Sequence, residues 1–526
     1  MEQISLFDIL HEKYQVTKPI KLIELFAGYG SQNLALKYLG ANYEHHRICE
    51  WATKSIQAYN DIHIQDYTDY SQCCTYEEVI NYLFNKGISM NYSEPMTYEQ
   101  IKRKGEQWCR TTYNNIIATR NLVNIQEAKA YDLDITDTEN FTYLLTYSFP
   151  CQDLSLAGKG KGMTKGSGTR SGLLWEVERL LDECVELNKR GKGHLPNILI
   201  MENVPQVVGT NSIKDFQDWV TKLESLGYSN FVEILNAKDY GIPQNRERCF
   251  MVSILGTYTY KMPKKRPLQY RLKDLLENEV DKKYYLSQQM IEGMMNTNFE
   301  SYKLENKLQD PDGIANCIIA RFEGTPQCIQ VPEATKKGYA EAYEGDGVYI
   351  NRPHQKRGCV QKGMIQTLKT SVDDVVGTIT ASAMQSFNHD NCHLVVEENR
   401  FFKQTFETLE TQDCEEGDII NAYNQTVDKS GTCPTLTTRH EGFKTAILPI
   451  TKDLGIRKLT PKECWRLMGV KDDDFENVSK NQSNSSLYHL AGDSIVTTVL
   501  MGLIGELLGI DYQSKITELT NSLKGK

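Results

Sequence analysis

The sequence lacks the cysteine spacing that a zinc site or a disulfide framework requires. Its 14 cysteines are scattered over 526 residues, with no C-x-x-C pair and no matching pair of histidines. We therefore expect neither a metal site nor a disulfide-stabilised extracellular fold. Free cysteines in this number are typical of a protein kept in a reducing compartment.

The sequence also lacks an export signal and a long hydrophobic run. Residues 1–18 contain no basic start followed by an apolar stretch, and the most apolar segment, residues 499–510, is short and includes Glu506. A membrane-spanning helix needs about 20 apolar residues. We therefore expect a cytoplasmic protein without a membrane span.

An excess of positive charge, the usual sign of a nucleic-acid-binding surface, is missing as well. The chain has 59 Lys and Arg against 69 Asp and Glu, a net charge of -10. This balance argues against a uniformly basic surface. Basic residues do gather locally, because residues 159–170 contain four and residues 351–371 contain five, with no acidic residue in either stretch. These stretches predict one positive cleft.

The first 255 residues alternate between short apolar runs and amphipathic segments. A strand is expected at 21–26, a tight turn at Gly28 and Gly30, and a helix at 31–39 with Ser31 as its N-cap and Gly40 at its end. Further strands are expected at 144–149, 197–201, 231–236 and 248–255, and helices at 173–187 and 213–226. This alternation predicts an α/β fold with a mostly parallel, doubly wound sheet.

The character of the chain changes along its length, which exceeds what one hydrophobic core usually holds. A first domain is expected at 18–265, with a polar and helical insertion at 67–131. Residues 266–450 predict a second, mostly β domain, in which a strand–turn–strand pattern recurs at 315–331, 377–396 and 431–448. Residues 451–526 turn helical again, with an apolar helix expected at 493–508.

A glycine turn and a carboxylate suggest a site for an adenosine-type ligand. Gly28 and Gly30 follow the first strand, and Glu50 lies 20 residues beyond Gly30 at the end of a second strand. Backbone N–H groups of such a turn can approach a ligand, and a carboxylate in that place can accept from both ribose hydroxyls. A turn of this kind also occurs as a mere packing device.

A cysteine stands where a predicted strand passes into a cationic, glycine-rich loop. Cys151 follows Pro150, and residues 154–172 contain Lys159, Lys161 and Arg170. Nearby cations favour the thiolate, so Cys151 is a candidate nucleophile. The alternatives are a buried structural cysteine and a solvated linker.

Two further segments place charged groups at strand ends. Glu202 follows the strand at 197–201, so it should share a crevice with Cys151 and the glycine turn. Arg246 and Arg248 precede another strand and are expected on the same face of it. A salt-bridged structural glutamate and surface ion pairs are the alternatives.

Taken in order, these segments resemble the motif series of the DNA cytosine-5 methyltransferases. The series comprises residues 26–30, Glu50, Asp134 with Ile135, 149–153, 202–204, 244–248, 457–470 and 491–496. Agreement in order of many short motifs is more specific than any single one. The resemblance implies a Rossmann-like catalytic domain at 18–265, a target-recognition domain at 266–450 and a C-terminal segment, 451–526, that returns to the catalytic domain.

The resemblance also implies roles for individual residues. S-adenosylmethionine would donate a methyl group to C5 of a cytosine flipped out of double-stranded DNA, with Cys151 bonded to C6. Glu202 would contact N3 and the exocyclic amine, and Arg248 would contact O2 with support from Arg246. The implied cofactor contacts are Phe26, Ala27, Gly28, Gly30, Glu50, Trp51, Asp134, Ile135, Pro150, Asp493 and Ser494; the implied DNA contacts are Gln152, Ser155, Lys159, Lys161, Arg170, Thr435 and Leu436.

The implied setting is restriction–modification or phage-type protective methylation by a monomer in a bacterial cytosol, associated with the nucleoid through DNA. A cognate restriction endonuclease is a candidate partner. The alternatives are an RNA cytosine-5 methyltransferase and a catalytically silent DNA-binding homologue. The large β-rich region disfavours the first, and the intact set of Cys151, Glu202 and Arg248 disfavours the second.

Two departures from the family pattern stand out. Asp493 occupies a position where the family usually has asparagine, which puts the cofactor contacts there in doubt. The threefold β pattern exceeds the usual recognition region, so Thr378–Ile379 or Ile318–Ile319 could mark additional recognition units, as in multispecific phage enzymes. Repeats that only extend the β scaffold are the alternative.

Overall fold

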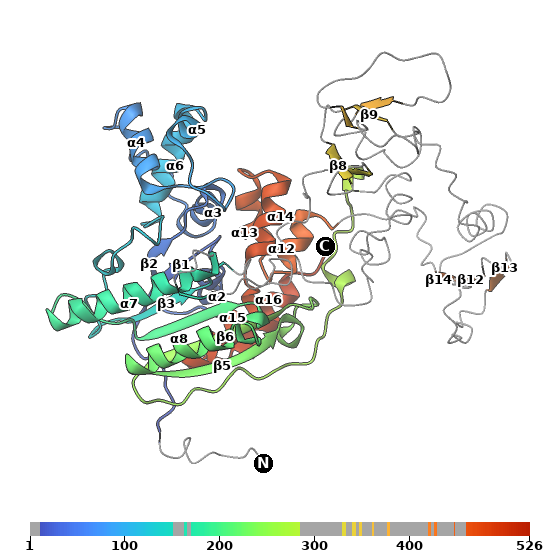
Figure 1. Ribbon diagram of the computed structural model, residues 1–526. Coiled ribbons are helices and arrows are strands. Elements are labelled where there is room, and N and C mark those ends of the chain that lie inside the picture. Colours follow the sequence, from blue (N-terminus) through green and yellow to red (C-terminus); the bar gives the residue numbers. More distant parts are fainter. Residues whose placement is uncertain are drawn as a thin grey trace. The chain divides into compact units, whose positions relative to one another are not determined.

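The computed structural model (Figure 1) describes residues 11–150, 163–165, 170–284 and 459–525, and short strands between 329 and 447. It divides into two compact units. The first is built from the chain up to Glu279 and from Leu459 onward, and the second from most of the residues between them.

A six-stranded sheet in the order β2-β1-β3-β4-β6-β5 forms the centre of the first unit. Strands β1 to β4 are parallel to one another, whereas β6 is antiparallel to both β4 and β5. The predicted α/β class with a mostly parallel, doubly wound sheet is confirmed. The strand bounds are Ile20–Leu25 (β1), Tyr43–Cys49 (β2), Thr142–Tyr147 (β3), Ile198–Asn203 (β4), Tyr228–Asn236 (β5) and Glu247–Leu255 (β6).

Helices cover both faces of this sheet, because neighbouring strand residues point to opposite sides. Leu22 packs into a core with α2 (Ser31–Leu39), and Ile23 packs into a second core with α7 (Leu174–Lys189) and α8 (Ile213–Ser225). The strands are therefore apolar on both faces. Polar side chains gather at the carboxyl ends of the strands instead.

The turn between β1 and α2 differs from the prediction at its cap. Gly30, with φ 84, is the N-cap, and Ser31 is the first residue of the helix without capping it. The prediction of Ser31 as N-cap is therefore wrong, because the left-handed turn itself occupies the cap position. Gly40 ends the helix as predicted, with its N–H bonded to the carbonyls of Leu36 and Lys37.

The C-terminal segment forms five helices against the first core. They are α12 (Pro461–Arg466), α13 (Asp472–Ser479), α14 (Asn484–Asp493), α15 (Thr497–Leu508) and α16 (Tyr512–Ser522). The apolar helix predicted over 493–508 is confirmed as α15 except at its start, since α14 ends at Asp493 and α15 begins at Thr497. Arg246 bonds the carbonyls of Gly492 and Ser494, which removes them from a continuous helix.

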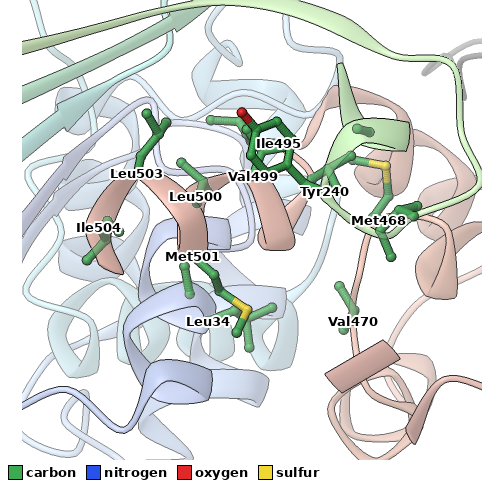
Figure 2. Close-up of a cluster of buried hydrophobic side chains, with 14 of the residues drawn as sticks. Leu34, Tyr240, Met468, Val470, Ile495, Val499, Leu500, Met501, Leu503 and Ile504 are labelled. Atoms are coloured by element: carbon green, nitrogen blue, oxygen red, sulfur yellow. The ribbon is translucent and has the colours of Figure 1, made fainter. Parts of the chain in front are cut away.

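Helix α15 is apolar on nearly all sides because it is buried. Leu500, Met501 and Ile504 pack in one cluster with Leu34 of α2 (Figure 2). The stretch Asn484–Leu508 is long and apolar enough to cross a membrane by length and composition alone, but 89% of its apolar window is buried inside the protein. Its hydrophobicity is accounted for by this core.

Three helices within residues 67–131 build a small core of their own. They are α4 (Tyr76–Lys86), α5 (Tyr98–Lys102) and α6 (Glu106–Ala118). Val79, Leu83, Ile101 and Ile116 pack there with Ile56 of α3 (Thr53–Tyr59). This helical cluster is thus attached to the helix that follows Glu50.

In the second unit the structure describes a short 3-10 helix, Lys282–Tyr284, and short strands, and each pair among these strands is antiparallel. Thr378 ends one of these strands, whereas Thr435 and Leu436 lie outside the described residues. The strands are β7 (Ile329–Pro332), β8 (Tyr339–Ala342), β9 (Gly347–Tyr349), β10 (Val360–Gln361), β11 (Val376–Thr378), β12 (Ile419–Asn421), β13 (Thr426–Asp428) and β14 (Ala446–Ile447).

Candidate active site

The glycine turn after β1 is shaped by two different requirements. At Gly30, an added Cβ would lie 2.4 Å from His63 Nε2 and 2.6 Å from a ring carbon of Tyr59, so only glycine fits. At Gly28, with φ 55, a Cβ would meet no atom within 4 Å. Gly30 therefore packs against the protein, while Gly28 faces open space that a ligand can use.

Glu50 lies directly beside this open space. Its Oε2 accepts a hydrogen bond from the Gly28 N–H at 2.9 Å, and its Oε1 accepts one from the Ala52 N–H at 2.8 Å. Burial raises the pKa of Glu50 to about 7; the two N–H groups act against this rise, and the Asp493 carboxylate adds to it. A carboxylate offers about four acceptor positions, so positions remain for ligand hydroxyls. The donor set and the space fit an adenosine-type cofactor.

Glu202, on β4, contacts residues at the ends of two other strands, β3 and β6. Its Oε1 lies 3.1 Å from Arg248 Nε of β6, and its Oε2 accepts a hydrogen bond from the hydroxyl of Ser148, just after β3. The side chains of Glu202 and Arg248 are only 8% and 18% exposed. Their attraction is therefore little screened by water. The ion pair holds one carboxylate edge at the carboxyl end of β4.

The backbone that leads into Cys151 is held from two sides. Asn203 Nδ2 donates to the Phe149 carbonyl at 3.0 Å, and Ser171 Oγ donates to the Pro150 carbonyl at 2.7 Å. Pro150 is thus fixed near Glu202. Cys151, Gln152, Ser155, Lys159, Lys161 and the side chain of Arg170 lie outside the described residues.

The two arginines of the 244–248 segment have different partners. Arg248 pairs with Glu202, whereas Arg246 is 4% exposed and donates to the carbonyls of Gly492 at 3.0 Å and Ser494 at 2.6 Å. Arg246 therefore connects the start of β6 to the junction of α14 and α15. These contacts fasten the C-terminal segment to the sheet.

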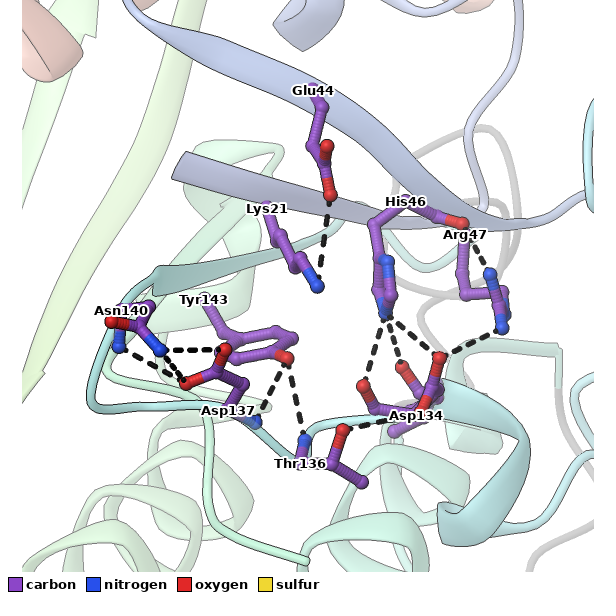
Figure 3. A network of polar contacts seen from close by, with 10 residues as sticks. Lys21, Glu44, His46, Arg47, Asp134, Thr136, Asp137, Asn140 and Tyr143 are labelled. Atoms are coloured by element: carbon purple, nitrogen blue, oxygen red, sulfur yellow. Dashed lines mark hydrogen bonds and ion pairs between the residues drawn. The ribbon is translucent and has the colours of Figure 1, made fainter. Parts of the chain in front are cut away.

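Asp134 and Ile135 make their contacts along β2 and in the core. Asp134 Oδ2 lies 3.1 Å from Arg47 Nη2, and the carbonyls of Leu133 and Asp134 each lie 3.1 Å from His46 Nε2 (Figure 3). Ile135 is buried in the core that α7 and α8 form with one face of the sheet. Asp134 also lines a cavity of about 550 Å³ between β2 and α6. Its predicted adenine contact stays a prediction.

The remaining predicted cofactor residues surround Glu50 or close α14. Ala27 packs on Ile48 and Tyr59, and Trp51 is partly buried against the helical cluster. Asp493 Oδ2 lies 3.0 Å from His489 Nε2, and Ser494 Oγ donates to the Leu490 carbonyl at 2.6 Å. Asp493 therefore has a partner that the sequence pattern did not predict.

Ser148, Asn203 and Ser171 were missed from the sequence although they fix Glu202 and Pro150. Their signal was weak, because an isolated serine or asparagine has many ordinary uses. Ser148 and Asn203 do stand at the carboxyl ends of strands, where a doubly wound sheet gathers ligand groups. That position was the only available signal.

Comparison with known proteins identifies the family of the chain. The family description "C-5 cytosine-specific DNA methylase" matches residues 86–509. Orphan methyltransferase M.SssI of Spiroplasma monobiae is 40% identical over 273 residues, which cover 52% of this chain and 68% of that protein. Type II methyltransferase M2.ScrFI of Lactococcus lactis subsp. cremoris is 29% identical over 493 residues, covering 93% and 99% of the two chains. The crystal structure of the S. pombe Dnmt2 methyltransferase aligns with a TM-score of 0.45 and 15% identity over 94% of this chain and 99% of that one.

The fold and the family match define a Rossmann-like methyltransferase. More narrowly, the chain belongs to the C-5 cytosine-specific DNA methylase family. It is thus an enzyme of the class that methylates cytosine in DNA.

Proposed function

We propose that the chain transfers a methyl group from S-adenosylmethionine to C5 of a cytosine flipped out of double-stranded DNA, through a covalent bond between Cys151 and C6. The observation that carries this proposal is the arrangement of Glu202, Arg248 and Ser148 beside Pro150, the residue that precedes Cys151. A carboxylate and an arginine are held together, the carboxylate is bonded to a residue two positions before Pro150, and the candidate nucleophile follows Pro150 in the chain.

The chemistry explains why a thiol is needed. C5 of cytosine is a weak nucleophile, and addition of the Cys151 thiolate to C6 moves the C5–C6 π electrons onto C5. C5 then bonds to the methyl carbon while the bond from that carbon to sulfur breaks. Loss of the C5 proton to a base restores the double bond and expels the thiolate.

Glu202 and Arg248 act on the ring during the addition. Glu202 holds a proton at N3, which offsets the negative charge that develops on the ring, and Arg248 donates toward O2. Ser148 fixes the second oxygen of Glu202, so the carboxylate cannot rotate away. Fixed donors cost no reorganisation when the charge appears.

The methyl donor fits the glycine turn. S-adenosylmethionine supplies an electrophilic methyl group on a sulfonium. Gly28 offers space, Glu50 accepts from the ribose hydroxyls, and Phe26, Trp51 and Asp493 complete the surroundings.

DNA is bound by two parts of the chain. The loop after Cys151, with Lys159, Lys161 and Arg170, contacts phosphates and closes over the flipped base, together with Gln152 and Ser155. Residues 266–450 read sequence in the major groove, with Thr435 and Leu436 among the contacts. Residues 18–265 and 451–526 together form the catalytic part.

Protective methylation in the cytosol is the proposed setting, with a cognate endonuclease as a candidate partner. Relatives of this chain are named type II and orphan methyltransferases, which supports DNA as the substrate. The RNA alternative is not favoured, because the family description names DNA.

Replacement of the nucleophile tests the proposal. Cys151→Ser should abolish methyl transfer to duplex DNA while S-adenosylmethionine binding, measured by calorimetry, stays near normal. A duplex with 5-fluorocytosine at the target should trap the unaltered enzyme as a covalent adduct, since fluorine cannot leave as a proton. Turnover by Cys151→Ser, or no adduct with any fluorinated target, contradicts the covalent mechanism.

A further inference from the structure

A loop between α4 and α5 is bound to the segment that follows Glu50. Ser89 N–H donates to the Trp51 carbonyl at 2.8 Å, and Thr53 N–H donates to the Ser89 carbonyl at 2.9 Å. The Met96 N–H closes the loop by donating to the Ile88 carbonyl at 2.8 Å. These hydrogen bonds join the backbone of the loop to the backbone of the segment that follows Glu50.

The same loop is held rigidly around Tyr92. The side-chain oxygen of Asn91 accepts from the N–H groups of Ser93 and Glu94, both at 3.0 Å, and Ser89 Oγ donates to the Glu94 carbonyl at 2.7 Å. Tyr92 has φ 59, a left-handed conformation that residues other than glycine rarely adopt. Such a conformation persists where the surroundings require it, which is common in ligand-binding segments.

Tyr92 reaches from this loop to α14. Its ring centroid lies 4.1 Å from that of His489, and its hydroxyl lies 3.5 Å from Ser55 Oγ. Burial raises the pKa of the Tyr92 hydroxyl, and the negative charges of Glu50 and Asp493 add to the rise. Tyr92, His489 and Asp493 thus form a chain of contacts from this loop to the end of α14.

The stability of α14 does not explain why a carboxylate, that of Asp493, stands at its last residue. A carboxylate at the last residue of a helix is unfavourable, because the carbonyl end of the helix is already negative. Its contact with His489 is an ion pair only when the imidazole is protonated, and the cation then stands four residues before the anion, the weaker of the two orientations. The side chain is nevertheless 51% exposed toward solvent, so its carboxylate is available to a cationic ligand.

We propose that Tyr92 and His489 are positioning residues, which hold the Asp493 carboxylate against the positive ammonium group in the amino-acid part of S-adenosylmethionine. The inference rests on the proposed function, because it assigns residues to the cofactor of that reaction. The ammonium and the sulfonium of this cofactor are positive, and a charge-assisted hydrogen bond to a carboxylate is stronger than a neutral one. The helical cluster at 67–131 thereby contributes to the cofactor site through one loop.

Two ligands separate this role from a general structural one. S-adenosylmethionine carries the amino-acid part, whereas 5′-methylthioadenosine carries the adenosine and lacks it. In calorimetry on the full chain, Tyr92→Ala and His489→Ala should each raise the Kd for S-adenosylmethionine about tenfold, the usual scale for losing a hydrogen bond to a charged group. The Kd for 5′-methylthioadenosine should change by less than about twofold.

Conservative and control variants complete the test. Tyr92→Phe keeps the ring against His489 and should bind both ligands like the unaltered chain, as should Tyr131→Ala, whose side chain is 68% exposed. Equal losses for both ligands in Tyr92→Ala and His489→Ala, or no loss for either, would overturn the positioning role. If the unaltered chain binds neither ligand, the proposed function itself fails.

Discussion

Arg248 Nε lies 3.1 Å from Glu202 Oε1 across the antiparallel pair of β6 and β4. This ion pair exists because β6 runs opposite to its neighbours. Its amino end, where Arg248 stands, therefore lies beside the carboxyl end of β4, where Glu202 stands. An all-parallel sheet would place residues 246–248 at the opposite edge, away from Glu202.

Removal of Arg248 should affect catalysis rather than cofactor binding. Arg248→Ala leaves Glu202 without its cation and should lower kcat on duplex DNA about 100-fold, the scale of losing one donor to a developing charge. The Kd for S-adenosylmethionine should be unchanged, because Glu50 and Gly28 are not altered. Arg248→Lys, which keeps the charge, serves as the control and should retain part of the rate. A full rate in Arg248→Ala would contradict the role of the pair.

Ser148 gives a finer test of the same carboxylate. Ser148→Ala removes the hydroxyl that donates to Glu202 Oε2 and should lower kcat about tenfold, the scale of one hydrogen bond to a charged group. Ser148→Thr keeps the hydroxyl and should stay closer to the original rate. Steady-state methyl transfer gives kcat for both variants. Equal kcat values for the alanine and threonine variants would show that the hydrogen bond to Glu202 does not matter for catalysis.

Alanine substitutions at the two glycines of the turn should differ in their effects: one should mainly lower stability, and the other should mainly weaken cofactor binding. Gly30→Ala forces a Cβ against His63 and Tyr59 and should lower the free energy of unfolding by about 3 kcal/mol. Gly28→Ala meets open space and should cost only about 1 kcal/mol, yet it should weaken S-adenosylmethionine binding because the methyl fills the ligand's space. Urea unfolding and calorimetry measure the two effects. The reverse order of stabilities would show that Gly28 packs against the protein.

Glu24 predicts a pH dependence of stability. Burial raises the pKa of Glu24 to about 8, although the hydroxyl of Tyr59 and the N–H of Asn33 act against the rise. The ordinary value is 4.5, so between these pH values the folded chain holds a proton that the unfolded chain has lost. Stability therefore falls as pH rises through this window. Glu24→Gln removes the effect.

Urea unfolding at several pH values measures the Glu24 effect. The advantage of Glu24→Gln over the unaltered chain should grow by on the order of 3 kcal/mol between about pH 5 and about pH 8. If the free energies of unfolding of the two chains changed with pH in the same way, the pKa of Glu24 would not be raised in the folded chain. Glu24 lies in β1, before the glycine turn, and has no part in the proposed reaction. The test therefore needs no measurement of methyl transfer.

Much of the fold could be predicted because apolar runs mark buried strands. The prediction of a strand at 21–26 agrees with β1 within one residue, and the helix predicted at 31–39 matches α2. The antiparallel direction of β6 could not be predicted, since an apolar run has no direction. The break between α14 and α15 depends on Arg246, which is more than 240 residues away in the chain.

The site was predictable only where a residue type itself indicates chemistry. Glu50 and Glu202 stand at strand ends, so their location followed from the strand pattern. The contact of Tyr92 with His489 joins residues 397 positions apart, through a loop whose shape depends on Asn91. No short-range pattern encodes such a contact.

The bonds from Arg246 to Gly492 and Ser494 have a consequence for synthesis. The carbonyls that Arg246 requires belong to residues that leave the ribosome only after the entire second unit. The core between α2 and α15 is likewise unfinished until that point. Methylation competence should therefore arise in one late step, when the C-terminal helices dock, and a chain stopped before residue 490 should remain inactive.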